Sequence, residues 1–318
     1  ESEFELIGVE DLPRLEEALA SERRSKPGEG SASWHFLDLR PHNFQEEILD
    51  AINEEREAGL NKHLVIAATG TGKTMVAAFD YRRFSESLGK GKRPSLLFIA
   101  HREEILAQSM STFRHVLRDE SFGDLLVGGH TPAQTRHLFC SVQSWNARQL
   151  SQLAADHFDY VVLDEAHHAA AASYKRILDH VQPQVLLGLT ATPERADGQD
   201  IRHDFGDRFT HEMRLADAIE ARHLVPFHYF GIGDHSDVDF SGLTWLRGGY
   251  RTEDLDRIVG TNERRARWVL HQLADHVADL AGTRALGFCV SQSHARFMAD
   301  YFNTQGLAAE VLTADSPD

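Results

Sequence analysis

The chain alternates short apolar runs with longer segments in which apolar residues recur every three or four positions. The short runs predict strands, and the recurrence near 3.6 residues predicts helices. Regular alternation of the two is typical of an α/β fold with a parallel sheet. The predicted strands of the first part are 63–69, 95–101, 138–142, 160–164 and 185–190, and the predicted helices are 74–88, 103–117, 173–181 and 215–222.

A second set of elements follows residue 222, after a polar loop and a short helix. It comprises predicted strands 227–232, 285–290 and 309–312 and predicted helices 262–280 and 293–303. The Gly- and Asp-rich stretch 231–249 predicts a long loop or an insertion. We therefore expect three parts: an acidic segment and linker (1–33), a complete first domain (34–222) and the N-terminal part of a second domain (223–318).

Charge limits the surfaces that can bind nucleic acid. The chain has 33 Lys and Arg against 49 Asp and Glu, a net charge of −16. Nucleic-acid-binding surfaces are usually basic, so composition alone favours an acidic metabolic enzyme, and any nucleic acid must bind a confined surface. No run approaches the ~20 apolar residues of a membrane span, and no positively charged start precedes an apolar run, so we expect neither a membrane span nor a secretory signal in these residues. Two distant cysteines, Cys140 and Cys289, exclude a disulfide scaffold and a zinc site and fit the cytoplasm.

Residues 67–74 read Ala-Ala-Thr-Gly-Thr-Gly-Lys-Thr, between a predicted strand and a predicted helix. Glycines let such a loop curl so that its amides point at phosphate oxygens, and the helix N-terminus adds partial positive charge. Lys73 would reach the β and γ phosphates of ATP, and the Thr74 hydroxyl would bind Mg²⁺. Ala67 stands where the usual pattern has Gly, and a tight turn that contains Gly-Lys-Thr by chance is the alternative. The proposed phosphate-binding residues are Thr69, Gly70, Thr71, Gly72, Lys73 and Thr74.

Two adjacent carboxylates, Asp164 and Glu165, follow the apolar run 160–163. Ligands of open α/β sheets bind at the carboxyl ends of strands, where these side chains would lie. Asp164 suits the Mg²⁺ shell, and Glu165 can orient and deprotonate the attacking water. A transition-metal site on His167 and His168 is disfavoured, because neighbouring histidines diverge and no His-Glu-x-x-His spacing occurs.

With Thr190-Ala191-Thr192, these segments resemble superfamily 2 helicases of the DEAH-box kind, whose motors consist of two RecA-like domains. The resemblance implies that residues 164–167 form motif II, with His167 among its catalytic residues. It also implies that Thr190 and Thr192 form motif III, which couples the nucleotide state to nucleic-acid binding. The stretch from Arg40 to Gln45 resembles the adenine-reading Q motif, so Arg40 and Gln45 are expected to bind ATP. A solvent-facing Gln45 on an amphipathic helix is the alternative.

Further segments resemble the motifs that line the strand-binding face of this family. They imply contacts with the sugar-phosphate backbone, which carry little sequence information. Each residue has an alternative role as a helix cap or loop residue. The expected nucleic-acid-binding residues are Arg102, Gly129, Ser141, Gln143 and Ser144.

From about residue 39 onward, the chain is most similar to bacterial DEAD/DEAH-box helicases related to restriction-enzyme motors. That resemblance implies ATP and Mg²⁺ as cofactors. It also implies that the partner is double-stranded DNA rather than RNA. Some members carry a phospholipase-D-like nuclease domain, so a nuclease is a further expected partner. The family's motif V, and motif VI with its arginine finger, do not occur in these residues.

Three functions remain open from the sequence. The first is an ATP-driven helicase or translocase, and the second is a nucleotide-gated binding or sensing module of a larger assembly. The third, a metabolic kinase, is disfavoured because it needs neither motif III nor the motif around Arg102.

Overall fold

The chain divides into two compact units, Glu1–Pro226 and Phe227–Asp318. This division falls close to the boundary predicted after residue 222. The predicted acidic segment, residues 1–33, lies outside the residues that the structure describes. The computed structural model describes residues 39–89, 91–147, 150–168, 172–194, 200–233, 239–241, 243–246, 249–313 and 316.

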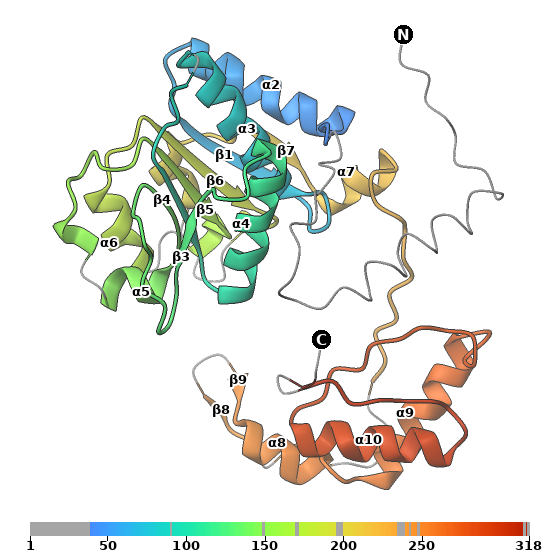
Figure 1. The fold of residues 1–318 in the computed structure, drawn as a ribbon. Helices are drawn as coiled ribbons and strands as arrows, with labels where there is room; N and C mark the ends of the chain where they lie inside the picture. The colour runs from blue at the N-terminus through green and yellow to red at the C-terminus, as the bar shows by residue number, and fades with distance from the viewer. Residues whose placement is uncertain are drawn as a thin grey trace, which may run out of the picture. The chain divides into compact units, whose positions relative to one another are not determined.

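The first unit is built around a seven-stranded sheet (Figure 1). Its strands are β1 (Lys62–Ala67), β2 (Leu96–Ala100), β3 (Asp124–Leu126), β4 (His137–Ser141), β5 (Tyr160–Asp164), β6 (Val185–Thr190) and β7 (His211–Met213). They lie in the order β3-β4-β2-β5-β6-β1-β7, and each neighbouring pair is parallel. The predicted α/β fold with a parallel sheet is confirmed.

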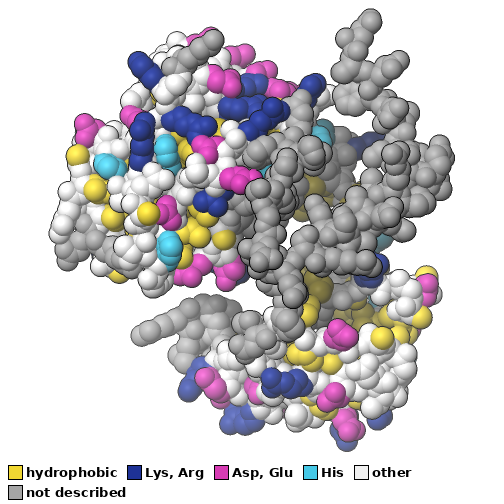
Figure 2. Space-filling model, viewed as in Figure 1, with side chains coloured by type: hydrophobic (Ala, Val, Ile, Leu, Met, Phe, Trp, Pro, Cys, Tyr) yellow, Lys and Arg dark blue, Asp and Glu magenta, His cyan; other side chains and the backbone are white. Residues whose placement is uncertain are grey.

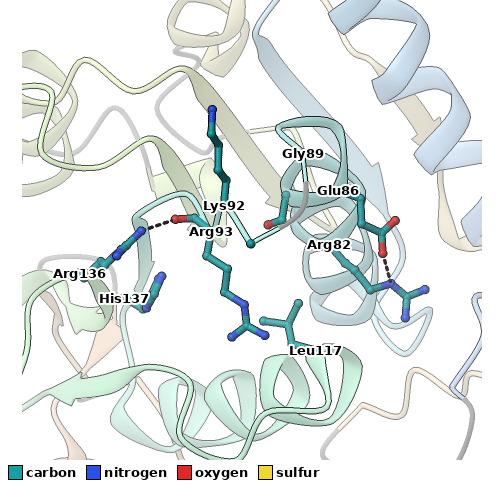
Figure 3. Close-up of a pocket in the computed structure, with 10 residues that line it drawn as sticks. Arg82, Glu86, Gly89, Lys92, Arg93, Leu117, Arg136 and His137 are labelled. Carbon is teal, nitrogen blue, oxygen red and sulfur yellow. Dashed lines mark hydrogen bonds and ion pairs between the residues drawn. The ribbon is translucent and has the colours of Figure 1, made fainter.

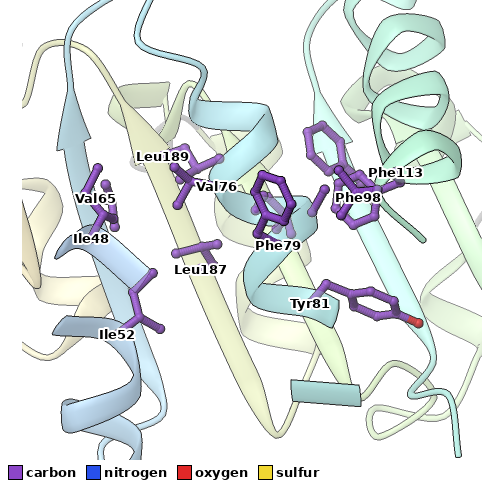
Figure 4. Close-up of a cluster of buried hydrophobic side chains, with 14 of the residues drawn as sticks. Ile48, Ile52, Val65, Val76, Phe79, Tyr81, Phe98, Phe113, Leu187 and Leu189 are labelled. Carbon is purple, nitrogen blue, oxygen red and sulfur yellow. The ribbon is translucent and has the colours of Figure 1, made fainter. Parts of the chain in front are cut away.

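Helices cover both faces of this sheet, which explains why its strands read as continuous apolar runs. The helices are α2 (Asn43–Glu57), α3 (Lys73–Ser87), α4 (Glu103–Leu117), α5 (Val142–Ala147), α6 (Ala172–His180) and α7 (Leu215–Glu220), with 3-10 turns η2 (Leu150–Gln152), η3 (Ala166–His168) and η4 (Ile201–Phe205). One face packs against α2, α3 and α4 through Ile48, Phe79 and Phe113 (Figure 4). The other packs against α5 and α6 through Trp145 and Ile177.

Strand order decides which loops meet at the edge of the sheet. Because all the strands are parallel, their carboxyl ends lie at one edge. β5, β6 and β1 are consecutive neighbours, with Asp164 beside Leu189 and Ile66 beside Thr190. The segments that leave these three strands therefore meet, and they are the three motifs singled out in the sequence.

The second unit contains helices and one short hairpin in the residues described. They are α8 (Thr252–Val259), α9 (Glu263–His276), α10 (Gln292–Thr304) and the antiparallel pair β8 (Trp245–Leu246) and β9 (Gly249–Tyr250). The strands predicted at 227–232, 285–290 and 309–312 are wrong, because none of these segments joins a sheet.

The physical reason lies in what makes a strand. Apolar residues favour an extended chain, but a strand exists only where a neighbour completes its hydrogen bonds. Within the described part of the second unit these segments have no such neighbour, and most of their side chains are exposed, 86% at Tyr229 and 95% at Phe288.

Several short elements of the structure were not predicted from the sequence, among them β3, β7, α5, the pair β8 and β9, and α8. β3 and β7 have three residues each, too few to show a periodicity. α8 begins three residues after the loop predicted at 231–249. Among the described helices, none has the length and apolar character needed to cross a membrane.

Candidate functional site

The phosphate loop joins the buried end of β1 to α3. Gly70 and Gly72 have φ of +89° and +80°, the left-handed region that side chains strain, so the turn requires these glycines. The Lys73 Nζ donates to the Ala67 carbonyl at 3.3 Å and thus lies over the loop. The first turn of α3, which includes Thr74, follows directly. This geometry is that of a helix N-terminus prepared for an anion.

Ala67, the departure from the usual pattern, is the last residue of β1 and lies beside Met213 of β7. Ala67 is 1% exposed, and its φ is not positive, so this position does not need glycine. Thr69 is exposed at the outer side of the loop, whereas Thr71 is buried and its hydroxyl donates to the Ala68 carbonyl at 2.7 Å.

Gln45 holds the phosphate loop from the first turn of α2. Its Nε2 donates to the Thr71 carbonyl at 3.0 Å, and its Oε1 accepts from the His42 amide at 3.0 Å. A Cβ at Gly72 would lie 2.7 Å from this Nε2, so glycine also makes room for the amide. Gln45 is 4% exposed, so the solvent-facing alternative is wrong. Adenine reading by Gln45 and the exposed Arg40 stays a prediction.

Two carboxylates lie across from the loop at the end of β5. Asp164 is 6% exposed, and Glu165 follows it with φ +55°, a strained conformation for a residue with a side chain. Burial, followed by the neighbouring Glu165 carboxylate, raises the pKa of Asp164 to about 6, and the Lys73 ammonium opposes this rise. The phosphate loop and the carboxylates therefore share one electrostatic environment, in which a further cation would stabilise the ionised Asp164.

A chain of contacts links the carboxylates to β6. The His167 Nδ1 lies 3.2 Å from the Glu165 Oε2 and 3.0 Å from the Thr190 Oγ1. Thr190 is fully buried, and its hydroxyl donates to the Thr192 carbonyl at 3.1 Å and accepts from the Thr192 amide at 3.2 Å. The structure thus brings together His167, Thr190 and Thr192, which sequence reasoning had assigned to two motifs.

The predicted nucleic-acid residues gather at the carboxyl ends of β2 and β4. Arg102, Ser141, Gln143 and Ser144 line a cavity of about 660 Å³, here called the strand-end cavity. Gly129 lies outside this lining, next to Gly128, which belongs to it.

The lining residues of the strand-end cavity differ in what they offer a ligand. Arg102 and Gln143 are exposed, and the Gln143 amide lies 3.2 Å from the His101 Nδ1. Ser141 and Ser144 are buried, and the Ser141 hydroxyl accepts from the Ser144 amide at 3.1 Å, the geometry of a helix cap. The alternative role as a cap therefore describes Ser141, and Arg102 and Gln143 offer free surface to a strand.

Residues 38–195, about half of the chain, match the family model described as "Type III restriction enzyme, res subunit". This part of the chain is a superfamily 2 helicase domain. It is related to the motor subunits of type I restriction enzymes and to Irc3 helicases.

Known relatives extend the likeness into the second unit. The candidate mitochondrial ATP-dependent helicase irc3 of Schizosaccharomyces pombe is 24% identical over 299 residues, 92% of this chain and 48% of irc3. The EcoAI endonuclease subunit, a type I restriction enzyme of Escherichia coli, is 28% identical over 277 residues, 79% of this chain and 33% of that subunit. The chain therefore spans half or less of the length of these relatives.

A solved structure shares the fold. It is a fragment of a candidate HsdR subunit of a type I restriction enzyme from Vibrio vulnificus, with a TM-score of 0.53 and 20% identity. The match covers 92% of this chain and 51% of the fragment.

The structure adds residues to the helicase site that sequence reasoning missed. The His223 and Phe44 rings lie 4.3 Å apart, and the Leu224 Cδ2 would lie 3.4 Å from a Cβ at Gly70. The segment after α7 thus packs on the phosphate loop. No motif marks His223 or Leu224, because their contacts depend on how α2 and α7 pack together.

Proposed function

We propose that this chain belongs to a motor that hydrolyses ATP and uses the energy to move on or remodel double-stranded DNA. The meeting of the phosphate loop, the Asp164–Glu165 pair and Thr190 at neighbouring strand ends carries the proposal. The two relatives described above, an ATP-dependent helicase and a restriction endonuclease subunit, support it. A cytoplasmic location and an attached nuclease belong to the same proposal.

In this proposal each side chain has a defined task at ATP. Lys73 holds the β and γ phosphates, because its ammonium lies at the anion-binding end of α3. Glu165 orients the attacking water and takes its proton. His167 connects Glu165 to Thr190 and so links hydrolysis to the segment after β6.

The residues present fit a magnesium ion. Asp164 offers a buried carboxylate whose ionised form needs a nearby cation, and Thr74 offers a hydroxyl in the first turn of α3. When bound, Mg²⁺ neutralises charge on the phosphates of the substrate.

For DNA, the exposed side chains of Arg102 and Gln143 support contact with the phosphodiester backbone. Such contacts position a strand without reading its sequence, which suits a motor that passes over any sequence.

The test is ATP hydrolysis by the chain with duplex DNA, single-stranded DNA, duplex RNA and no nucleic acid, together with displacement of a triplex-forming strand from duplex DNA. DNA-stimulated hydrolysis with displacement would support translocation. ATP-dependent DNA binding without displacement would favour the nucleotide-gated binding module. Absence of ATP binding would refute both.

A further inference from the structure

A second cavity lies at the opposite edge of the sheet from the ATP site. It has a volume of about 790 Å³ and is bounded by the end of α3, the turn after it, the starts of β2 and β4 and the last residue of α4. Four cationic side chains line it against one carboxylate, Glu86 (Figure 3). We call it the basic cavity, after Arg82, Lys92, Arg93 and Arg136.

Local contacts hold the guanidinium groups of this cavity in place. Arg93 pairs with Asp119, and its guanidinium lies 5.7 Å from the Phe122 ring centroid. The Arg136 Nη2 donates to the Arg93 carbonyl at 2.6 Å. Each guanidinium has five N–H donors, so these contacts leave donors for a ligand.

Arg82 is fixed in a similar way on the other side of the cavity. Its guanidinium lies 5.0 Å from the Phe79 ring centroid, and its Nη1 donates to the Val116 carbonyl at 3.4 Å. Lys92 is exposed and leaves the turn in the opposite direction to Arg93 (Figure 3).

The concentration of positive charge here is unusual for this chain. The lining carries four cations and one carboxylate, or +3, and Asp119 behind Arg93 reduces this to +2, whereas the whole chain has a net charge of −16. Among the described residues, neither Lys92 nor Arg136 pairs with a carboxylate within 4.0 Å. Figure 2 shows Lys and Arg side chains gathered on the upper part of the first unit. Cations that outnumber the carboxylates beside them repel one another, so an anionic ligand would stabilise them.

Helix α4 connects the basic cavity to the strand-end cavity. Its first residue, Glu103, lines the strand-end cavity, and its last, Leu117, lines the basic cavity, about 21 Å away for a helix of this length. Between Ile105 and Leu117 the helix carries no Asp or Glu, and its exposed residues include Gln108, Ser111 and His115. The stretch from Ile105 to Leu117 therefore carries no negative charge, whereas Glu103 and Glu104 line its start in the strand-end cavity.

We propose that the basic cavity binds the phosphodiester backbone of duplex DNA, as a second contact on the face along α4. This inference rests on the proposed function, in which the strand-end cavity holds the first contact. Guanidinium forks match phosphate geometry, and a repeating polyanion can occupy both cavities, since about 21 Å is under one turn of B-DNA (about 34 Å).

The experiment measures binding of a fluorescent 30-base-pair duplex to the full chain between 50 and 200 mM salt. In the variant Lys92→Ala/Arg136→Gln, the loss of two phosphate contacts should make the slope of log K against log salt shallower by about 1.8 and weaken binding at 50 mM roughly tenfold. The matched control, Lys175→Ala/Arg202→Gln, removes the same charge from residues that pair with Asp204 and Asp200, and it should bind as the wild type does. Thermal melts of all three proteins establish that they fold.

Three results would overturn the proposal. One is a cavity variant with the affinity and slope of the control. Another is a cavity variant that loses binding to poly-glutamate but keeps its binding to DNA, which would assign the cavity to an acidic protein. The third is a wild-type chain that binds no duplex, which would refute the proposed function as well. The variant Arg102→Ala/Gln143→Ala separates these cases, because it should weaken DNA binding even if the basic cavity plays no part.

Discussion

Replacing Gln45 separates two roles that the sequence and the structure give this residue. As an adenine reader it would act on the base, and as a support of the phosphate loop it would act on the phosphates. In the structure its amide joins the His42 amide and the Thr71 carbonyl, both at 3.0 Å. Gln45→Ala removes both bonds and leaves two backbone groups without these partners.

The magnitude follows from the two hydrogen bonds. Each contributes about 1 kcal/mol net, so their loss costs about 2 kcal/mol, or roughly 30-fold in affinity if the energy positions the loop. Gln45 also caps α2 by accepting from the amide of the N-cap residue His42, so part of the loss falls on the stability of that helix. We therefore expect nucleotide affinity to fall about 10- to 30-fold.

Calorimetry with a non-hydrolysable ATP analogue, the matching GTP analogue and inorganic tripolyphosphate distinguishes the roles. If Gln45 supports the loop, Gln45→Ala weakens all three ligands by the same factor, because tripolyphosphate has no base. The exposed Gln108→Ala makes the same change on α4 and should alter none of them. Unchanged tripolyphosphate binding with a tenfold loss of the ATP analogue would refute loop support and favour base reading.

Further predictions concern the charged and titrating groups. Lys73→Ala should weaken ATP binding at least tenfold with an unchanged thermal melt, because the ammonium lies over the loop and not in the core. Glu165→Gln should retain ATP binding but lower hydrolysis about 10²- to 10⁴-fold, whereas Asp164→Asn should weaken Mg²⁺-dependent binding; equal phenotypes would contradict this division of roles. Burial lowers the pKa of His137 from 6.5 to about 4, so the neutral form stabilises the fold above pH 6.5 and that stability is lost as the pH falls towards 4. Between pH 7 and pH 5 the free energy of unfolding of the wild type should fall by about 1 kcal/mol more than that of His137→Leu, after allowance for solvent screening. Equal changes in the two proteins, measured by denaturation, would refute this prediction.

The sequence predicted the parts of the fold and site that depend on local pattern. The strand predicted from the apolar run that ends at Asp164 has the same bounds as β5, because a buried parallel strand can be recognised from its own composition. The loop from Gly70 to Lys73 was predictable for the same reason, because the turn chemistry and the phosphate chemistry use the same glycines.

Contacts between elements that are distant in the sequence could not be predicted from this local pattern. The Gln45 bond to Thr71 spans 26 residues and depends on how α2 packs on α3. A buried pair between Arg56 and Asp80 fixes that packing, with the Tyr160 hydroxyl donating to the same Asp80 carboxylate. The basic cavity likewise draws on segments 54 residues apart, Arg82 to Arg136, and only the run Lys-Gly-Lys-Arg at 90–93 gave a local sign of it.

The acidic composition and the proposed DNA track are compatible because electrostatic attraction acts over short distances. At physiological salt a charge is screened beyond about 8 Å, so phosphates at α4 respond to Arg102, Lys92 and the charges beside them, which include Glu103 and Glu86, and little to acids elsewhere. Nine of the 49 acidic residues lie in the first 30 positions, so part of the net charge belongs to one segment of the chain. A motor must also release each phosphate in turn, and a surface that is acidic outside the track restricts DNA to one path while keeping non-specific affinity low. The negative net charge, which argued against nucleic-acid binding at the level of composition, thus confines DNA to a defined route on the surface.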